Sequence, residues 1–312
     1  MPMPASSDLP SALPTNLLQA VAQAAEMLTQ AGVAFGHGTD NAWDEAAWLV
    51  LWQLGLPLDT DLQGAQGQQA INAAQWQAIL ALLARRIHER VPAAYLTGEA
   101  WLHGVPFYID ARSIVPRSLI AGPIVDGTLD IWLSDRTRRV LDLCTGNGSL
   151  AVLAALAWPD VTVDALDLSA DALAVAAINV QRHDLQSRIR CIQSDALGAL
   201  QPGVDCYDLV LCNPPYVNSQ SMATLPAEYR AEPALALAGG DDGMDFIRPV
   251  LRQLPHFMTE SAVLVLEVGH EAEHFERAFP DLVGHWLATP DGTRQVIVLE
   301  RDALLQGIAQ RP

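Results

Sequence analysis

Residues 139–151 read RVLDLCTGNGSLA, and this stretch decides the fold class. The apolar run over 139–143 predicts a buried strand, and Gly146 and Gly148 predict a tight loop that opens directly into a helix. The spacing Gly146-x-Gly148-x-x-Ala151 lets a ligand approach the backbone and the free N–H groups of that helix. A strand, a glycine loop and a helix in this order predict the first unit of a parallel sheet.

Strands and helices are expected to alternate from this unit to the end of the chain. An apolar helix is predicted before it, over residues 118–134. The fold class is therefore predicted to be α/β, with a doubly wound, mainly parallel, seven-stranded sheet. The remaining strands are predicted at 161–166, 189–193, 207–212, 261–268, 282–287 and 295–300.

The residues before this domain have a different pattern. Apolar residues recur at three- and four-residue spacing over 17–90, which predicts a small helical domain for substrate docking. Residues 1–16 are rich in Pro, Ser and Ala and predict a flexible tail. Short aromatic runs broken by glycines over 91–112 predict a β-hairpin connector, so the α/β domain is expected to cover 113–312.

The charge balance narrows the class of partner. The chain has 36 acidic and 18 basic residues, a net charge of −18, and no lysine. A Schiff-base or P-loop lysine is therefore excluded, and direct DNA binding, which depends on neutralising phosphates, is not expected. An acidic surface attracts a basic protein by long-range electrostatics.

Cysteine usage and the N-terminal sequence indicate the compartment. The four cysteines have no metal-type spacing and lie in or beside apolar runs, which predicts buried, reduced thiols. The N-terminal segment lacks the features of a signal peptide, and no apolar run approaches the length of a membrane span. A cytoplasmic protein without membrane association is expected.

Three predicted strands each end in a carboxylate, at Asp142, Asp167 and Asp195. Since the carboxyl ends of parallel strands meet at one edge of a sheet, these side chains should lie in line beside the glycine loop. A single strand-end Asp is usually a helix cap, whereas three in register favour nucleoside binding. A nicotinamide dinucleotide would need its pyrophosphate over the glycine loop. S-adenosylmethionine has no phosphate, and its ammonium and sulfonium suit these acids.

The tetrapeptide Asn213-Pro214-Pro215-Tyr216 follows the predicted strand 207–212. Both prolines restrict the backbone, so the loop should be stiff, with the Asn213 side-chain oxygen and carbonyl groups as hydrogen-bond acceptors. Such a loop suits a planar donor that carries an –NH2 group, either an amide or the amine of a base. A plain Pro-Pro turn is the alternative reading.

The D-x-x-T-G-x-G loop and the Asn-Pro-Pro-Tyr loop together resemble the class I S-adenosylmethionine-dependent methyltransferases that modify amino or amide nitrogens. Residues 95–98 (YLTG), 115–117 (VPR) and 232–233 (EP) are similar to the glutamine N5-methyltransferases. Residues 213–217 (NPPYV) and 225–230 (LPAEYR) resemble the branch of that family that acts on the third large-subunit ribosomal protein. One departure is Gly122, where that branch generally carries a glutamate.

The resemblance implies S-adenosylmethionine as cofactor, a basic ribosomal protein as substrate, and a role for each matching residue. Asp142 would lie near the ammonium, Asp167 would bind the ribose, and Asp195 the adenine amine. Asn213 and the Pro214 carbonyl would accept the two amide hydrogens of a glutamine, and Tyr216 would pack on its plane. The implied cofactor-binding residues are Asp142, Thr145, Gly146, Gly148, Asp167, Asp195 and Asn213. The implied substrate-binding residues are Asn213, Pro214, Pro215 and Tyr216, of which Asn213, Pro214 and Tyr216 are catalytic.

Four alternatives stay open on the residues alone. The substrate could be a peptide release factor, or an adenine N6 position in nucleic acid, although the charge disfavours the latter. A non-catalytic nucleoside-binding or ribosome-assembly module would leave the Asn-Pro-Pro-Tyr loop unexplained. Residues 270–274 (HEAEH) match a zinc motif, but no third ligand follows, so a solvated helix face is favoured and no metal is expected.

Overall fold

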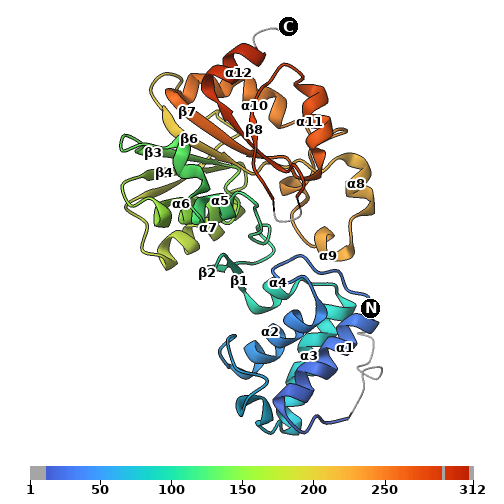
Figure 1. Cartoon of the computed structure of the whole chain (residues 1–312). Coiled ribbons are helices and arrows are strands. Elements are labelled where there is room, and N and C mark those ends of the chain that lie inside the picture. Colours follow the sequence, from blue (N-terminus) through green and yellow to red (C-terminus); the bar gives the residue numbers. More distant parts are fainter. Residues whose placement is uncertain (1–11, 290–291, 309–312) are drawn as a thin grey trace. The chain divides into compact units, whose positions relative to one another are not determined.

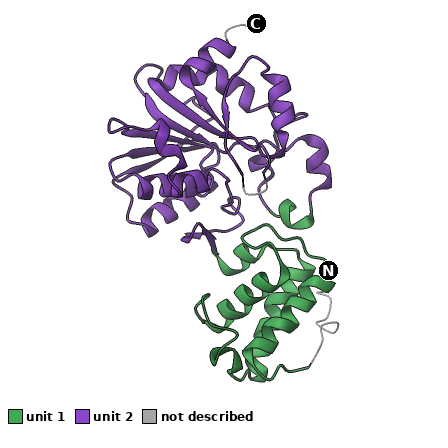
Figure 2. Ribbon diagram, in the orientation of Figure 1, with its two compact units in different colours: residues 1–99, 226–231 green, residues 100–225, 232–312 purple. Residues whose placement is uncertain are grey.

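The computed structural model describes residues 12–289 and 292–308. Within them the chain forms two compact units (Figure 2). The first comprises the described residues up to Glu99 together with Pro226–Ala231. The second comprises Ala100–Leu225 and the described residues from Glu232 onward. Most of the tail predicted over residues 1–16 lies outside the described residues.

The first unit is helical, as the 3.6-residue periodicity predicts. Asn16, Asn41 and Asn72 cap its three long helices, each accepting a hydrogen bond from the backbone N–H three residues later. The helical character predicted over residues 17–90 is confirmed. The helices of the unit are α1 (Leu17–Gln30), α2 (Ala42–Leu54), a 3-10 turn (Gln66–Gln68), α3 (Ala73–His88), α4 (Ala93–Thr97) and α9 (Ala227–Arg230).

The predicted hairpin is shorter than expected. Its strands are β1 (Glu99–Leu102) and β2 (Val105–Tyr108), and residues 93–97 form the helix α4 instead. Pro92 occupies the N-cap of α4, four good helix formers or aromatic residues follow, and Gly98 ends the helix at φ 69°. Short helical runs between Pro and Gly are hard to separate from strands by periodicity alone.

The helix predicted over residues 118–134 is also wrong in extent. The structure has α5 (Ala121–Val125) and a 3-10 helix (Thr128–Trp132). Between them Gly127 has a φ of 78°, a left-handed conformation that an α-helix cannot continue through.

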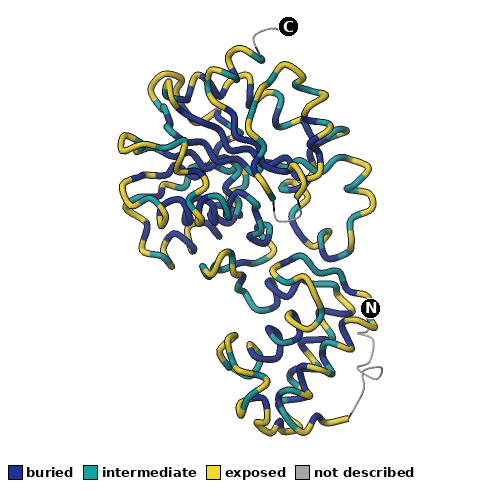
Figure 3. Tube along the Cα trace, in the orientation of Figure 1, coloured by how far each residue is buried: buried dark blue, intermediate teal, exposed yellow. Residues whose placement is uncertain are grey.

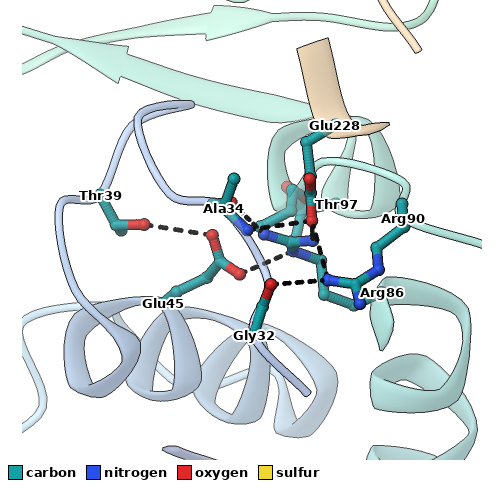
Figure 4. Close-up of polar contacts among 9 residues, drawn as sticks. Gly32, Ala34, Thr39, Glu45, Arg86, Arg90, Thr97 and Glu228 are labelled. Atoms are coloured by element: carbon teal, nitrogen blue, oxygen red, sulfur yellow. Dashed lines mark hydrogen bonds and ion pairs between the residues drawn. The ribbon is translucent and has the colours of Figure 1, made fainter. Parts of the chain in front are cut away.

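A buried polar network lies inside the first unit (Figure 4). The Arg86 guanidinium donates to Glu45 Oε1 at 2.7 Å, to Glu228 Oε1 at 3.0 Å and to the Ala34 carbonyl at 2.7 Å. Thr39 Oγ1 donates to the second oxygen of Glu45. Arg86, Glu45 and Glu228 are all at most 2% exposed. The network ties the short segment Pro226–Ala231 to helices α2 and α3 of the same unit.

The second unit is built on a seven-stranded sheet in the order β5-β4-β3-β6-β7-β9-β8 (Figure 1). The strands from β5 to β7 pair in parallel, and β9 runs antiparallel to β7 and β8. The predicted fold class is confirmed. The strands are β3 (Arg139–Leu143), β4 (Thr162–Asp167), β5 (Ile189–Gln193), β6 (Tyr207–Cys212), β7 (Met258–Glu267), β8 (His285–Trp286) and β9 (Val296–Glu300).

Helices cover both faces of this sheet. Alternate residues of each strand enter two separate cores: Val140 packs with one and Leu141 with the other. Most residues of the central strands β3, β4, β6 and β7 are accordingly dark blue in the burial view (Figure 3). One face carries α5, α6 (Ser149–Ala157) and α7 (Ala170–Arg182), and the other carries α10 (Ile247–Gln253), α11 (Ala272–Ala278) and α12 (Arg301–Ile308). A short helix, α8 (Ser219–Thr224), follows β6.

The predicted strands agree closely with the central sheet and less well at its edge. The strand predicted over residues 282–287 contains only two paired residues, His285 and Trp286, because it is an edge strand with a single neighbour. Among the described residues, none of the helices combines the length and the apolar character that crossing a bilayer requires.

We expect Arg86→Ala to lower the free energy of unfolding of the first unit by about 3–5 kcal/mol, because it leaves the buried Glu45 without its cation and Glu228 with only the longer contact to Arg90 at 3.4 Å. Urea titration followed by circular dichroism measures the change. Arg85→Ala is the matched control: Arg85 is about half-exposed and pairs only with Glu89 at 3.7 Å, so its loss should cost less than about 1 kcal/mol. Equal effects of the two substitutions would contradict the role given to the buried network.

Candidate functional site

A pocket lies at the carboxyl edge of the central strands. Sheet order reverses at β3, since β4 and β6 flank it on opposite sides, and ligands of open α/β sheets bind at such a point. The pocket encloses about 790 Å³, including the solvent at its mouth. Five residues of the predicted site line it: Gly146, Asp167, Asp195, Asn213 and Pro215.

The glycine loop between β3 and α6 has the backbone that the sequence predicts. Gly146 and Gly148 both have left-handed φ values, 55° and 81°. A Cβ on Gly148 would lie 3.1 Å from Cβ of Ala176 on α7, so a side chain there would push the loop from its helix. Gly148 therefore sets the packing of the loop, while Gly146 forms part of the pocket wall.

Asp142 supports this loop from the buried side and is not among the residues that line the pocket. Its Oδ2 accepts hydrogen bonds from Thr145 Oγ1 at 2.5 Å and from the Ala151 backbone N–H at 3.0 Å. Its Oδ1 is buried and has no hydrogen-bond partner among the described residues. Burial raises the pKa of Asp142 to about 7, against the hydrogen bonds from Thr145 and Ala151.

Asp167, at the end of β4, connects the glycine loop to the next strand. Its Oδ2 accepts the Gly146 N–H and its Oδ1 accepts the Ser169 N–H, both at 2.9 Å. Burial raises the pKa of this carboxyl as well. Asp195 is exposed at the pocket wall. The structure thus brings Asp167 and Asp195 into one pocket and leaves Asp142 beneath its floor.

The Asn-Pro-Pro-Tyr loop leaves β6 at the same edge. Asn213 is half-buried in the pocket wall, and its side chain makes no hydrogen bond with any other described residue. Pro215 also lines the pocket, whereas Pro214 is buried and Tyr216 is outside the lining. The Asn213 amide is therefore available to a ligand.

Backbone hydrogen bonds join this loop to the neighbouring segment 237–239. Val217 N–H donates to the Leu237 carbonyl and Gly239 N–H donates to the Val217 carbonyl, both at 2.8 Å. A Cβ on Gly239 would lie 2.8 Å from the Pro215 carbonyl oxygen, a distance that a real side chain cannot keep. The loop is thus held in one conformation by backbone bonds as well as by its prolines.

Tyr216 is held from two sides. Its hydroxyl donates to Glu267 Oε1 at 3.0 Å, and the face of its ring lies against Gly269, where an added Cβ would approach a ring carbon to 2.3 Å. Glu267 is 3% exposed, and its Oε2 accepts from Ser118 Oγ at 2.6 Å and from the Leu119 N–H at 2.9 Å. Burial raises the pKa of Glu267.

Several pocket residues carry no signal in the sequence. Cys144 and Ala196 line the pocket just beyond the ends of β3 and β5, and both have left-handed φ values, 63° and 44°. Strained backbone of this kind concentrates at functional sites, but nothing in the residue types predicts it. Leu235 and Phe246 come from segments after the Asn-Pro-Pro-Tyr loop and add apolar wall.

Two further predicted features lie away from the pocket. Gly122 lies in α5, and a Cβ on it would make ordinary contact with His103 at 3.6 Å. In the HEAEH segment, Glu271 binds Asn218 Nδ2 and His274 Nδ1, both at 2.5 Å. Within the ranges 12–289 and 292–308, no three His, Cys, Asp or Glu side chains are grouped so that they could hold a metal ion.

Comparison with known proteins identifies the family. Residues 128–230 match the family model described as Methyltransferase small domain, and residues 19–98 match the PrmC N-terminal domain. A ribosomal protein uL3 glutamine methyltransferase of Bordetella pertussis is 50% identical over 291 residues, which cover 93% of this chain and 96% of the relative.

Two other relatives of the same name agree. The protein of Burkholderia pseudomallei is 47% identical over 91% of this chain and 94% of its own length. That of Neisseria meningitidis serogroup B is 43% identical over 90% of this chain and 92% of its own length. With such identity over both units, the chain belongs to the family of ribosomal protein uL3 glutamine methyltransferases.

Proposed function

We propose that this protein transfers a methyl group from S-adenosylmethionine to the side-chain amide nitrogen, N5, of a glutamine in ribosomal protein uL3. One observation carries the proposal: the unpaired amide of Asn213 lies in the wall of the same pocket as Asp167 and the glycine loop. A planar amide and a nucleoside can therefore be recognised side by side.

The residues present fit S-adenosylmethionine. Asp167 can accept from the ribose hydroxyls, since a carboxylate has about four acceptor positions and the backbone N–H groups of Gly146, Leu168 and Ser169 occupy three. Asp195 is placed to accept from the adenine amine at the pocket wall. The partnerless Oδ1 of Asp142 supplies negative potential beneath the loop, which favours an ammonium above it. When bound, the cofactor supplies an electrophilic methyl group on a sulfonium.

An amide nitrogen is a weak nucleophile because its lone pair is delocalised into the carbonyl. The Asn-Pro-Pro-Tyr loop would compensate for this weakness. The Asn213 oxygen and the Pro214 carbonyl would each accept one amide hydrogen. These bonds strengthen as positive charge develops on the nitrogen, so they stabilise the transition state more than the ground state. The cofactor would supply the methyl group to the nitrogen held by these two acceptors, and the proton that the nitrogen then carries in excess would leave to water.

The charge of the chain fits a basic substrate. The chain has 18 arginines and 36 acidic residues. Its net charge of −18 would steer a positively charged ribosomal protein towards the enzyme and would repel nucleic acid. The cytoplasmic location and the absence of direct DNA binding expected from the sequence belong to this proposal. So does the substrate-docking role expected of the helical domain.

The proposal is tested by incubating the enzyme and methyl-labelled cofactor with three substrates in parallel. These are uL3 from a strain that lacks the methyltransferase, a peptide release factor, and DNA. Label is expected on a glutamine of uL3. Preferential labelling of the release factor would assign the alternative substrate, and label in none of the three would contradict the proposed activity.

We expect Asn213→Ala to lower kcat by roughly a hundredfold or more, as the loss of a transition-state hydrogen-bond partner does. Cofactor affinity should stay within about twofold of that of the unchanged protein, because the loop is proposed to bind the substrate amide. Isothermal titration with the cofactor and single-turnover methyl transfer separate the two effects. Equal loss of both would show that Asn213 serves the cofactor instead.

Asp167→Ala should weaken cofactor binding by roughly 10–100-fold, since it removes a charged hydrogen-bond acceptor. The matched control is Asp171→Ala, an exposed aspartate four residues later on α7 that is outside the pocket lining. Thermal unfolding should accompany the titration, because Asp167 also anchors Gly146. An unchanged dissociation constant in a folded variant would refute the ribose assignment.

Asp142→Asn should remove a pH dependence of stability. The pKa of Asp142 is about 7 in the folded protein, above its unfolded value near 4, so the folded state binds this proton more tightly. The stabilisation of the folded state by this proton is complete below about pH 4 and is lost as the pH rises to about 7. The free energy of unfolding falls by up to roughly 4 kcal/mol over this range.

The variant is therefore expected to be the more stable protein at pH 8 without cofactor, yet to bind the cationic cofactor more weakly. Urea titrations at pH 4.5, 6 and 8 test the first statement, and calorimetric titration with the cofactor tests the second. Identical pH profiles for the two proteins would contradict the account given of Asp142.

A further inference from the structure

Glu267 is a fully buried carboxylate that the proposed chemistry does not use. We propose that it is a positioning residue for methyl transfer: through its bond to the Tyr216 hydroxyl it sets the plane of the ring on which the substrate amide packs. The inference rests on the proposed function and on the packing of Tyr216 against the plane of the glutamine that the sequence resemblance implies.

The position of Glu267 follows from strand register. Cys212 at the end of β6 pairs with Leu266 of β7 in parallel. Asn213 and Glu267 are therefore the next residues of adjacent strands, at the edge where the pocket lies. The residue that binds Tyr216 thus comes from the rigid sheet, and not from the loop that it holds.

Both oxygens of Glu267 are engaged, so the carboxylate cannot rotate. Oε2 accepts from Ser118 Oγ at 2.6 Å and from the Leu119 N–H at 2.9 Å, which leaves Oε1 directed at the Tyr216 hydroxyl at 3.0 Å. The backbone N–H of Leu119 can only donate, so Oε2 must be an acceptor. Residues 115–118 (VPRS) thereby help to hold the Asn-Pro-Pro-Tyr loop in place.

The same segment is anchored a second time. Arg117 binds both oxygens of Glu232, at 2.6 and 2.7 Å, and Glu232 Oε1 also accepts the Val115 N–H at 2.9 Å. Glu232 is 4% exposed. Ser118 therefore presents its hydroxyl to Glu267 from a fixed backbone, so the hydrogen-bonded chain from Ser118 to Tyr216 starts and ends on immobile groups.

The other side of the ring closes the arrangement. Gly269, two residues beyond Glu267, has no side chain and lets the Tyr216 ring lie against its backbone. The hydroxyl contact fixes one end of the ring and the Gly269 contact holds its side. The plane of the ring is therefore set from two directions.

A double-mutant cycle tests the proposal. The variants are Glu267→Gln, Tyr216→Phe and the two combined, each measured for kcat, for KM of uL3 and for the dissociation constant of the cofactor. Glu267→Gln and Tyr216→Phe should each lower kcat about 10–100-fold, the effect of one hydrogen bond to a charged group. Cofactor affinity should be unchanged within about twofold. The double variant should be no worse than the more impaired single variant, because both remove the same bond.

The control is Glu276→Gln, an exposed glutamate on α11 that pairs with Arg294, which should retain the kcat of the unchanged protein. Thermal unfolding identifies any variant that fails to fold. If Glu267→Gln does not fold, Glu267→Asp replaces it: the charge stays, but the shorter side chain draws the carboxylate away from Tyr216, and the same loss in kcat is expected.

Three results would overturn the inference: an unchanged kcat in a folded Glu267 variant, a loss confined to cofactor affinity, or effects of the two substitutions that multiply. Failure of the proposed function has a different signature. In that case the unchanged protein itself would transfer no methyl group to uL3, so none of the variants could be compared on that substrate.

Discussion

The parallel pairing of β3 with β4 on one side and β6 on the other is the constraint on which the whole site depends. Because Leu143 pairs with Leu166 and with Cys212, the glycine loop, Asp167 and Asn213 all leave the sheet at the same level. The buried apolar residues of both sheet faces hold this register, since a slip by one residue would move the side chains of a strand to the opposite face of the sheet. No local interaction in the loops could bring these groups together without it.

Rigidity of the loops is then added by backbone and not by side-chain bulk. A Cβ is excluded at Gly239 by Pro215 and at Gly269 by Tyr216, and a Cβ at Gly148 would be a tight contact with Ala176. The prolines of the substrate loop act in the same direction, by narrowing the conformations of the unfolded chain. An enzyme that must align a weak amide nucleophile with a methyl group gains rate from such alignment before any acid or base is involved.

The sequence predicts the sheet, the long helices and five of the residues that line the pocket, because these depend on periodicity, on glycine and proline, and on the rule that strand ends share an edge. It does not predict contacts between distant residues. Arg86 and Glu228 are 142 positions apart, and Ser118 and Glu267 are 149 apart. Nor does it predict the left-handed backbone at Cys144 and Ala196, which the surrounding fold imposes. Asp142 looked like a pocket residue because strand-end position is visible in the sequence and side-chain direction is not.

Three carboxyl groups around this edge, those of Asp142, Asp167 and Glu267, have pKa values raised by burial. The charged form of each carboxyl is therefore less stable in the folded protein than in water. Oδ1 of Asp142 also has no hydrogen-bond partner among the described residues. Under the proposed function a cation enters beside Asp167 and above Asp142 and relieves part of that cost, so the unfavourable burial of these two carboxylates contributes to the binding free energy. The hydrogen bonds from backbone N–H groups to Asp167, and from Ser118 and Tyr216 to Glu267, keep these carboxylates fixed until then. The same burial that weakens the fold at neutral pH thus prepares the site for a sulfonium ligand.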